Sequence, residues 1–216
     1  MQLKNRTDKI RKILRQHYPE VKTQLFYETP FQLLVATILS AQCTDKQVNR
    51  VTKVLFDHLK APADFAGASL KTIEGFIRSA GFFHNKAKNI KNCSQQLLQS
   101  HDGRVPASLD ELVKLSGVGR KTANVVLGAA FGIPGIVVDT HVARISGRLG
   151  LTANKEPVKI EFDLMEIVPK RAWHDFCLHL IYFGRQTCSA RKPKCFLCPL
   201  EKLCPWPDKT TGPSNP

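Results

Sequence analysis

Apolar side chains recur three and four residues apart along most of the chain. That spacing places them on one face of an α-helix. The pattern predicts helices that begin at Pro30, after Thr44, at Ser69 and after Ser108, and helices over residues 84–98, 121–131, 140–148, 157–167 and 172–183. Strand patterns are nearly absent, because the one candidate, residues 135–138, is too short to be decisive. The chain is therefore expected to be all-α.

Several of these helices carry recognisable start signals. Thr29 followed by Pro30 combines a capping side chain with a first-turn proline. Ser108 with Glu111 has the spacing of a capping box. Asp139 directly precedes a helical pattern and is expected to be its N-cap.

The charge balance points to a polyanionic partner. Lys and Arg number 32 against 18 Asp and Glu, a formal charge of +14, and 43% hydrophobic residues can form a substantial core. Nucleic acid is the commonest partner of such a surface. Residues 1–11 have no apolar signal segment, and the longest apolar stretch, residues 125–138, is broken by Pro134. We expect a cytoplasmic monomer, associated with the nucleoid in a bacterium and without membrane contact.

A glycine-containing hairpin at residues 115–121 is a candidate phosphate site. Gly117 and Gly119 flank Val118, which permits a tight turn with positive φ angles. The next helix would direct its N-terminal amides outward, and Arg120 and Lys121 would add positive charge. A DNA phosphate fits such a site, although a plain helix connection with a solvated basic pair is the alternative. ATP binding is not expected, because the Lys-Ser/Thr ending and preceding strand of a P-loop are missing.

Seven cysteines are present, an odd number that argues against a disulfide framework. Cys43, Cys93 and Cys177 lie in apolar, helix-patterned sequence and are expected to be small core residues. The other four are spaced C-x6-C-x2-C-x5-C at Cys188, Cys195, Cys198 and Cys204. Structural zinc usually takes two close pairs, whereas a [4Fe–4S] cubane spreads its corners more widely. The spacing favours the cluster, with zinc as the alternative.

The loop between the first two of these cysteines carries Arg191, Lys192 and Lys194. Cations on a loop that is fixed at both ends by a metal centre suit contacts to DNA phosphates. The alternative is a solvated loop.

Four motifs together resemble the endonuclease III family of DNA glycosylases. They are LSAQCTD at residues 39–45, GVGRKTAN at 117–124, VDTH at 138–141 and the four-cysteine tail. The likeness extends from about residue 30 to residue 204. One departure is Ser116, where the family commonly has proline before the hairpin.

The resemblance implies a helix–hairpin–helix fold with two α domains and a [4Fe–4S] cluster. The domains would be a six-helix bundle at residues 22–132 and a cluster domain of residues 1–21 with 133–216, whose cluster loop is 188–204. Double-stranded DNA with damaged bases or abasic sites would lie in the cleft between them.

The resemblance also assigns roles to four side chains. Lys121 would be the nucleophile and Asp139 its assistant. Gln42 would fill the gap left by a base turned out of the helix. Phe82 would be a second wedge where the family has leucine, unless it packs in the core. Lys121 has to react as an uncharged amine, and we expect burial in the cleft to favour that form.

The expected function is base excision repair by a bifunctional enzyme. It would remove oxidised pyrimidines and cut the strand by β-elimination through a lysine Schiff base. The alternatives are a mismatch-specific thymine or uracil glycosylase on the same scaffold and a non-catalytic DNA-binding module. The module would not need Lys121 and Asp139 together.

Overall fold

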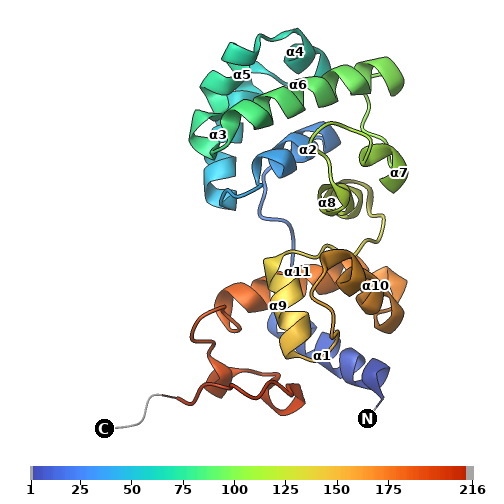
Figure 1. The fold of residues 1–216 in the computed structure, drawn as a ribbon, viewed down its shortest axis with the longest axis vertical. Coiled ribbons are helices and arrows are strands. Elements are labelled where there is room, and N and C mark those ends of the chain that lie inside the picture. Colours follow the sequence, from blue (N-terminus) through green and yellow to red (C-terminus); the bar gives the residue numbers. More distant parts are fainter. Residues whose placement is uncertain (1, 213–216) are drawn as a thin grey trace. The chain divides into compact units, whose positions relative to one another are not determined.

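The fold comes from a computed structural model in which residues 2–212 are described (Figure 1). This part of the chain contains α- and 3-10 helices and no strand, so the all-α prediction is confirmed. Residues 135–138 lie between two helices as irregular chain.

The chain divides into two compact units. The central unit is Thr23–Ile133, and the terminal unit is Met1–Lys22 with Pro134–Pro216. These limits lie one residue from those implied by the family resemblance.

The central unit, all of whose residues are described, contains seven α-helices rather than the expected six. They are α2 (Pro30–Leu39), α3 (Asp45–His58), α4 (Pro62–Gly67), α5 (Leu70–Ile77), α6 (Phe83–Ser100), α7 (Leu109–Leu112) and α8 (Arg120–Phe131), with the 3-10 helix η1 (Arg78–Ala80) before α6. The pattern did not predict α4, because six residues are too few to show a helical period. A carboxylate fixes its start, since Asp64 accepts the backbone N–H groups of Lys60 at 2.8 Å and Ala61 at 2.9 Å.

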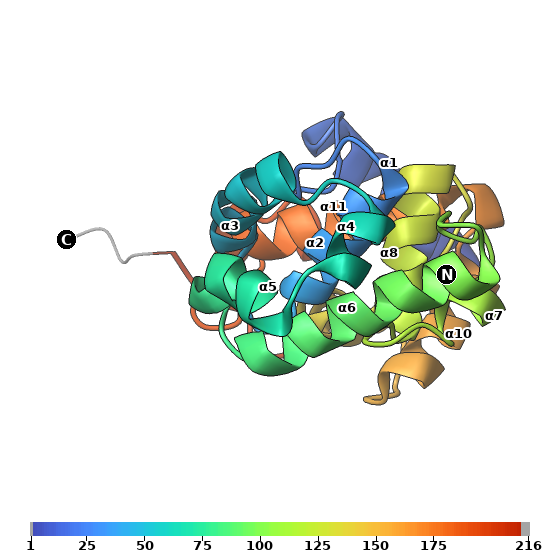
Figure 2. The same ribbon diagram turned by 90° about the horizontal axis from the view of Figure 1, so that it is seen from above.

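Helix α2 is the core of this unit. Nine of its ten residues are buried, and all of them except Gln32 and Thr37 are apolar, as suits a helix enclosed by others. Figure 2 shows it surrounded by α3, α6 and α8, with which it makes contacts. The neighbouring helix α6 packs on α4 and α5.

Two helix starts illustrate what capping signals predict. Thr29 caps α2 as expected, because its hydroxyl oxygen accepts the N–H of Gln32 at 3.2 Å. The capping box at Ser108 was predicted wrongly: among the described residues its side chain caps no amide of α7. Glu111 accepts instead from Lys114 at 2.6 Å, so the carboxylate is already engaged in an exposed ion pair.

In the part that the structure describes, the terminal unit assembles four α-helices from both ends of the chain. They are α1 (Leu3–His17), α9 (Thr140–Arg148), α10 (Pro157–Ile167) and α11 (Trp173–Gln186), with the 3-10 helices η2 (Lys170–Ala172), η3 (Cys195–Leu197) and η4 (Glu201–Leu203). Helix α11 packs on α1 and α9. Gly184 permits the close approach of α9, because a Cβ there would lie 2.7 Å from Ile145 Cδ1. No helix within residues 2–212 is both long and apolar enough to span a bilayer.

Candidate active site and metal centre

The predicted hairpin joins α7 to α8. Leu115 and Val118 are buried and anchor it, and the N–H of Val118 donates to the Leu115 carbonyl at 3.1 Å. Gly117 has a φ of 77°, and a Cβ at this position would lie 2.7 Å from Asn89 Cβ. Gly119 has a φ of −90°, so the expectation of positive φ holds for Gly117 alone. The difference arises because Gly119 is already the N-cap of α8, where extended backbone is normal.

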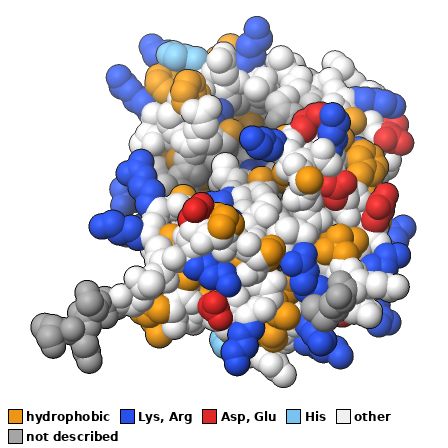
Figure 3. Space-filling view, turned by 60° about the horizontal axis from the view of Figure 1, so that its bottom comes forward, with side chains coloured by type: hydrophobic (Ala, Val, Ile, Leu, Met, Phe, Trp, Pro, Cys, Tyr) orange, Lys and Arg blue, Asp and Glu red, His pale blue; other side chains and the backbone are white. Residues whose placement is uncertain are grey.

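The N-terminus of α8 has the character of an anion site. Its N-cap is a glycine, which has no side chain to cover the first amides. Arg120 and Lys121 follow in the first turn, where a carboxylate would otherwise be favourable. Amides and cations that lie together at a helix N-terminus attract phosphate. Figure 3 shows Lys and Arg side chains spread over the face that it draws.

Lys121 is exposed, contrary to the expectation that its side chain is buried. It is the second residue of α8, and the buried side of this helix is occupied by Ala123, Asn124, Val126 and Leu127. The packing of this helix therefore leaves the Lys121 side chain at the surface.

Asp139 is the N-cap of α9, as predicted. Its carboxylate accepts the N–H of Val142 at 2.8 Å, and the side chain is partly exposed. The same helix carries Arg144, a residue that sequence reasoning missed. Its guanidinium donates to the carbonyl oxygen of Cys188 at 2.8 Å and lies 3.2 Å from Nδ1 of His141. Nothing in the spacing of charges along α9 predicts the hydrogen bond from Arg144 to Cys188, because Cys188 is distant in sequence.

Gln42 and Phe82 occupy exposed turns with left-handed backbone. Gln42 has a φ of 52° in the turn after α2, and Phe82 has a φ of 49° as the N-cap of α6. Each such non-glycine residue costs about 1–2 kcal/mol. Phe82 is 65% exposed, so the alternative that it packs in the core is wrong.

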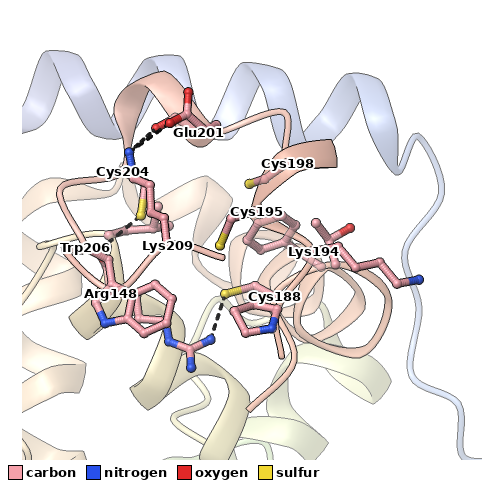
Figure 4. A pocket seen from close by; sticks show the side chains of 13 residues that line it. Arg148, Cys188, Lys194, Cys195, Cys198, Glu201, Cys204, Trp206 and Lys209 are labelled. Atoms are coloured by element: carbon pink, nitrogen blue, oxygen red, sulfur yellow. Dashed lines mark hydrogen bonds and ion pairs between the residues drawn. The ribbon is translucent and has the colours of Figure 1, made fainter. Parts of the chain in front are cut away.

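The four cysteines of the tail line one pocket, as Figure 4 shows. All four are partly exposed. Arg148 approaches one thiol, because its Nη1 donates to Cys188 Sγ at 3.3 Å. The same guanidinium donates to the carbonyl oxygens of Ser189 and Ala190 and lies 4.1 Å from the ring centroid of Trp206.

The four thiols are the candidate ligands of a metal centre. In residues 2–212, no three His, Cys, Asp or Glu side chains form a group that could hold a metal ion. Burial raises the pKa of the Cys198 thiol to about 11, so a metal centre would have to displace its proton. Four thiols around a shared space fit a polynuclear group in residue type and number.

The remaining cysteines behave largely as core residues. Cys93 and Cys177 are buried, and burial raises the pKa of each thiol to about 12. Cys43 is partly exposed and packs against the edge of the core, so the prediction holds for it only in part.

The cations of the cluster loop lie at the surface. Arg191, Lys192 and Lys194 are all exposed. The hydroxyl of Ser189 donates to the Arg191 carbonyl at 2.7 Å, which shapes this turn, and Lys192 has a φ of 49°.

Comparisons with known proteins agree with these features. Residues 35–170 match the family described as HhH-GPD superfamily base excision DNA repair protein. A relative from Synechocystis named Endonuclease III is 51% identical over 203 residues, which cover 94% of this chain and 93% of the relative. The chain belongs to the endonuclease III family. Its relatives of that name in Bacillus subtilis and Escherichia coli are 50% and 42% identical, over 87% and 91% of this chain and 86% and 93% of their own lengths.

Solved structures of two similar proteins share the fold. One described as a non-covalent endonuclease III–DNA complex has a TM-score of 0.91 and 44% identity, and it covers 95% of this chain and 96% of its own. A thermostable thymine-DNA glycosylase has a TM-score of 0.83 and 25% identity, over 93% and 95% of the two chains. As an endonuclease III-family member, this protein is a DNA glycosylase and AP lyase of base excision repair.

Proposed function

We propose that the enzyme removes oxidised pyrimidines of the thymine glycol type from duplex DNA and then cuts the abasic site through Lys121. The observation that supports this proposal is the position of Lys121. Its side chain is exposed on the first turn of α8, the candidate anion site, directly after the hairpin. A phosphate held at this helix end would bring the adjacent deoxyribose to the amine.

The chemistry assigned to Lys121 has two stages. The neutral amine attacks C1′, the bond to the damaged base breaks, and the base leaves with a proton. The C1′–O4′ bond of the sugar then opens, O4′ takes up a proton that the attached nitrogen has lost, and a Schiff base forms at C1′. The Schiff base makes the C2′ protons acidic, and loss of one breaks the C3′–O bond and expels the 3′ phosphate by β-elimination. Bound DNA would supply the desolvation that favours the neutral amine.

Asp139 assists base release in this proposal. A carboxylate fixed as an N-cap cannot swing away, so it can stabilise positive charge that develops on the sugar. Base release should depend on this charge more than strand cutting does.

Double-stranded DNA is bound through three sets of groups. The hairpin residues Gly117, Val118, Gly119 and Arg120 contact phosphates, and Arg191, Lys192 and Lys194 contact others. Gln42 and Phe82 enter the base stack and fill the gap left by the extruded nucleotide. Their exposure supports that role.

Cys188, Cys195, Cys198 and Cys204 would hold a [4Fe–4S] cluster. When bound, this group would have a structural role, because the chain around it has little core of its own. Brown colour and broad visible absorption would distinguish it from zinc.

A second candidate is removal of thymine or uracil opposite guanine. The fold similarity to a thymine-DNA glycosylase favours it, whereas the higher identity to endonuclease III relatives favours oxidised pyrimidines.

Borohydride trapping tests both candidates. The protein is reduced in the presence of duplexes that contain thymine glycol, 8-oxoguanine or a T·G mismatch. We expect a covalent complex with thymine glycol, none with Lys121→Ala, and normal trapping with Lys53→Ala, which changes an exposed lysine on α3. Trapping by Lys121→Ala at the wild-type level would refute the nucleophile, and trapping on the T·G duplex alone would favour the second candidate.

A further inference from the structure

Two exposed turns of the central unit are built alike. One follows α2 and carries Gln42, and the other follows η1 and carries Phe82. Both side chains are exposed on left-handed backbone, at φ values of 52° and 49°. Such backbone needs support from its surroundings to persist.

A single buried side chain contacts the helix ends that precede the two turns. Lys86, in the first turn of α6, is 5% exposed. Its ammonium donates to the carbonyl oxygen of Leu39, the last residue of α2, at 2.8 Å. It also donates to that of Ala80, the last residue of η1, at 2.8 Å.

Both acceptors are carbonyls at helix C-termini, which lack partners inside their helices. A cation suits this position, because the C-terminal end of a helix carries partial negative charge. Gln42 lies three residues beyond Leu39, and Phe82 lies two residues beyond Ala80. The backbone of Lys86 adds a further contact, since its N–H donates to the Phe82 carbonyl at 3.1 Å.

A second, exposed hydrogen bond joins the helices next to the two turns, α3 after the Gln42 turn and η1 before the Phe82 turn. The side-chain amide of Gln47 in α3 donates to the hydroxyl of Ser79 in η1 at 2.7 Å. The helices that flank the two turns are thus linked by Lys86 and by Gln47.

We propose that Lys86 is a positioning residue that holds the Gln42 and Phe82 turns at a fixed separation, so that both side chains can insert into the base stack of DNA. The inference rests on the proposed function, because it takes Gln42 and Phe82 as the inserting residues. Lys86 itself does not touch DNA. It fixes the separation of the two inserting turns, so that both enter the same duplex without first having to be ordered.

The burial of this cation is unfavourable by itself. Burial lowers the pKa of Lys86, and nearby Cys43 opposes that shift. An apolar residue would avoid the desolvation cost, but it would leave both carbonyls without this donor. The arrangement therefore favours a defined turn geometry over maximal stability.

The test compares Lys86→Met with Lys91→Met. Lys91 is a matched control, because it also lies on α6 and donates to two carbonyls, those of Ala66 and Ala68 near the end of α4. Each variant of the full-length protein is assayed on a thymine glycol duplex and on an abasic site in a single strand. Insertion is measured separately, by the fluorescence of 2-aminopurine opposite an abasic analogue in a duplex.

We expect Lys86→Met to lose roughly tenfold to a hundredfold in duplex excision rate. Its fluorescence change on binding should shrink, while cutting of the single strand, where no stack has to be opened, stays at the wild-type rate. Lys91→Met should match wild type in all three assays, and Lys86→Arg should recover most of the loss.

Equal losses on duplex and single strand would overturn the proposal, because they indicate general damage to the fold. Wild-type fluorescence and duplex rate in Lys86→Met would overturn it as well. If Lys86→Met does not fold, Gln47→Ala at the exposed link replaces it, and a wild-type duplex rate there counts against the linked turns. Failure of the proposed function is distinguishable, because it would appear as absent excision by the wild-type protein.

Discussion

The hairpin at residues 115–121 and the cluster loop at residues 188–204 are both short connecting segments, but they are held in different ways. The hairpin is anchored by buried Leu115 and Val118 and by the close approach of Gly117 to Asn89. In the cluster loop, all of which is described, Pro193 and Leu200 are the buried residues. Its remaining order comes from polar contacts such as those of Arg148.

The difference shows how each segment obtains its shape. Apolar burial and one glycine fold the hairpin without a ligand. The cluster loop directs four thiols at a shared space, and its own packing is too sparse to hold them there firmly. We therefore infer that the loop would depend on the cluster proposed for it, whereas the hairpin needs no bound group.

The largest effect should come from removing a thiol. Cys198→Ser should abolish visible absorption and raise amide exchange in residues 187–204 on the order of a hundredfold, because a bound metal centre stabilises folded chain by several kcal/mol. Exchange in the hairpin should stay unchanged. Cys43→Ser, at a partly exposed cysteine outside the pocket, is the control and should keep its absorption. Unaltered exchange in the loop of Cys198→Ser would contradict its dependence on the bound group.

The opposite experiment breaks the hairpin and spares the loop. Gly117→Ala should destabilise the protein by about 2–4 kcal/mol, because alanine disfavours positive φ and its Cβ would overlap Asn89. Gly119→Ala should cost less than about 1 kcal/mol, since no atom lies within 4 Å of the added Cβ. Urea unfolding measures both. Similar losses in the two variants would show that the positive φ and close contact at Gly117 are not decisive.

A smaller change sharpens the comparison inside the cluster loop. Arg148→Met removes hydrogen bonds to Ser189, Ala190 and Cys188 and the contact with Trp206, and it should cost about 2 kcal/mol. Arg148→Lys should restore part of this, because lysine keeps the charge but not the planar fork. Thermal unfolding and amide exchange in residues 187–204 are the measurements. Wild-type amide exchange in Arg148→Met would show that Arg148 does not order the loop.

The smallest effect is a pH dependence of the terminal unit. Burial lowers the pKa of His174, so the folded chain keeps this imidazole neutral while the unfolded chain takes up a proton near pH 6.5. Stability should therefore fall as the pH decreases from about 7 towards the lowered folded value. In His174→Asn, the free energy of unfolding should change less steeply with pH in this range, as measured by urea unfolding at several pH values. A slope equal to that of wild type would rule out His174 as a source.

The sequence pattern predicted most of the fold because its longer helices carry a clear apolar period. Helices α9 and α10 begin and end at the predicted residues, 140–148 and 157–167. Helix α4 was missed because six residues show no period, and the capping box at Ser108 failed because Glu111 binds Lys114 instead. Local rules do not reveal such competing partners.

For the candidate site, sequence determined which chemical groups are present, and tertiary structure decided their surroundings. The motifs identified Lys121, Asp139 and the four thiols, because residue type and spacing are properties of the chain itself. The exposure of Lys121, the contact of Arg148 with Cys188 and the two carbonyls bound by Lys86 required coordinates. Burial and long-range hydrogen bonds depend on which segments meet, and a single sequence does not encode those meetings in any local pattern.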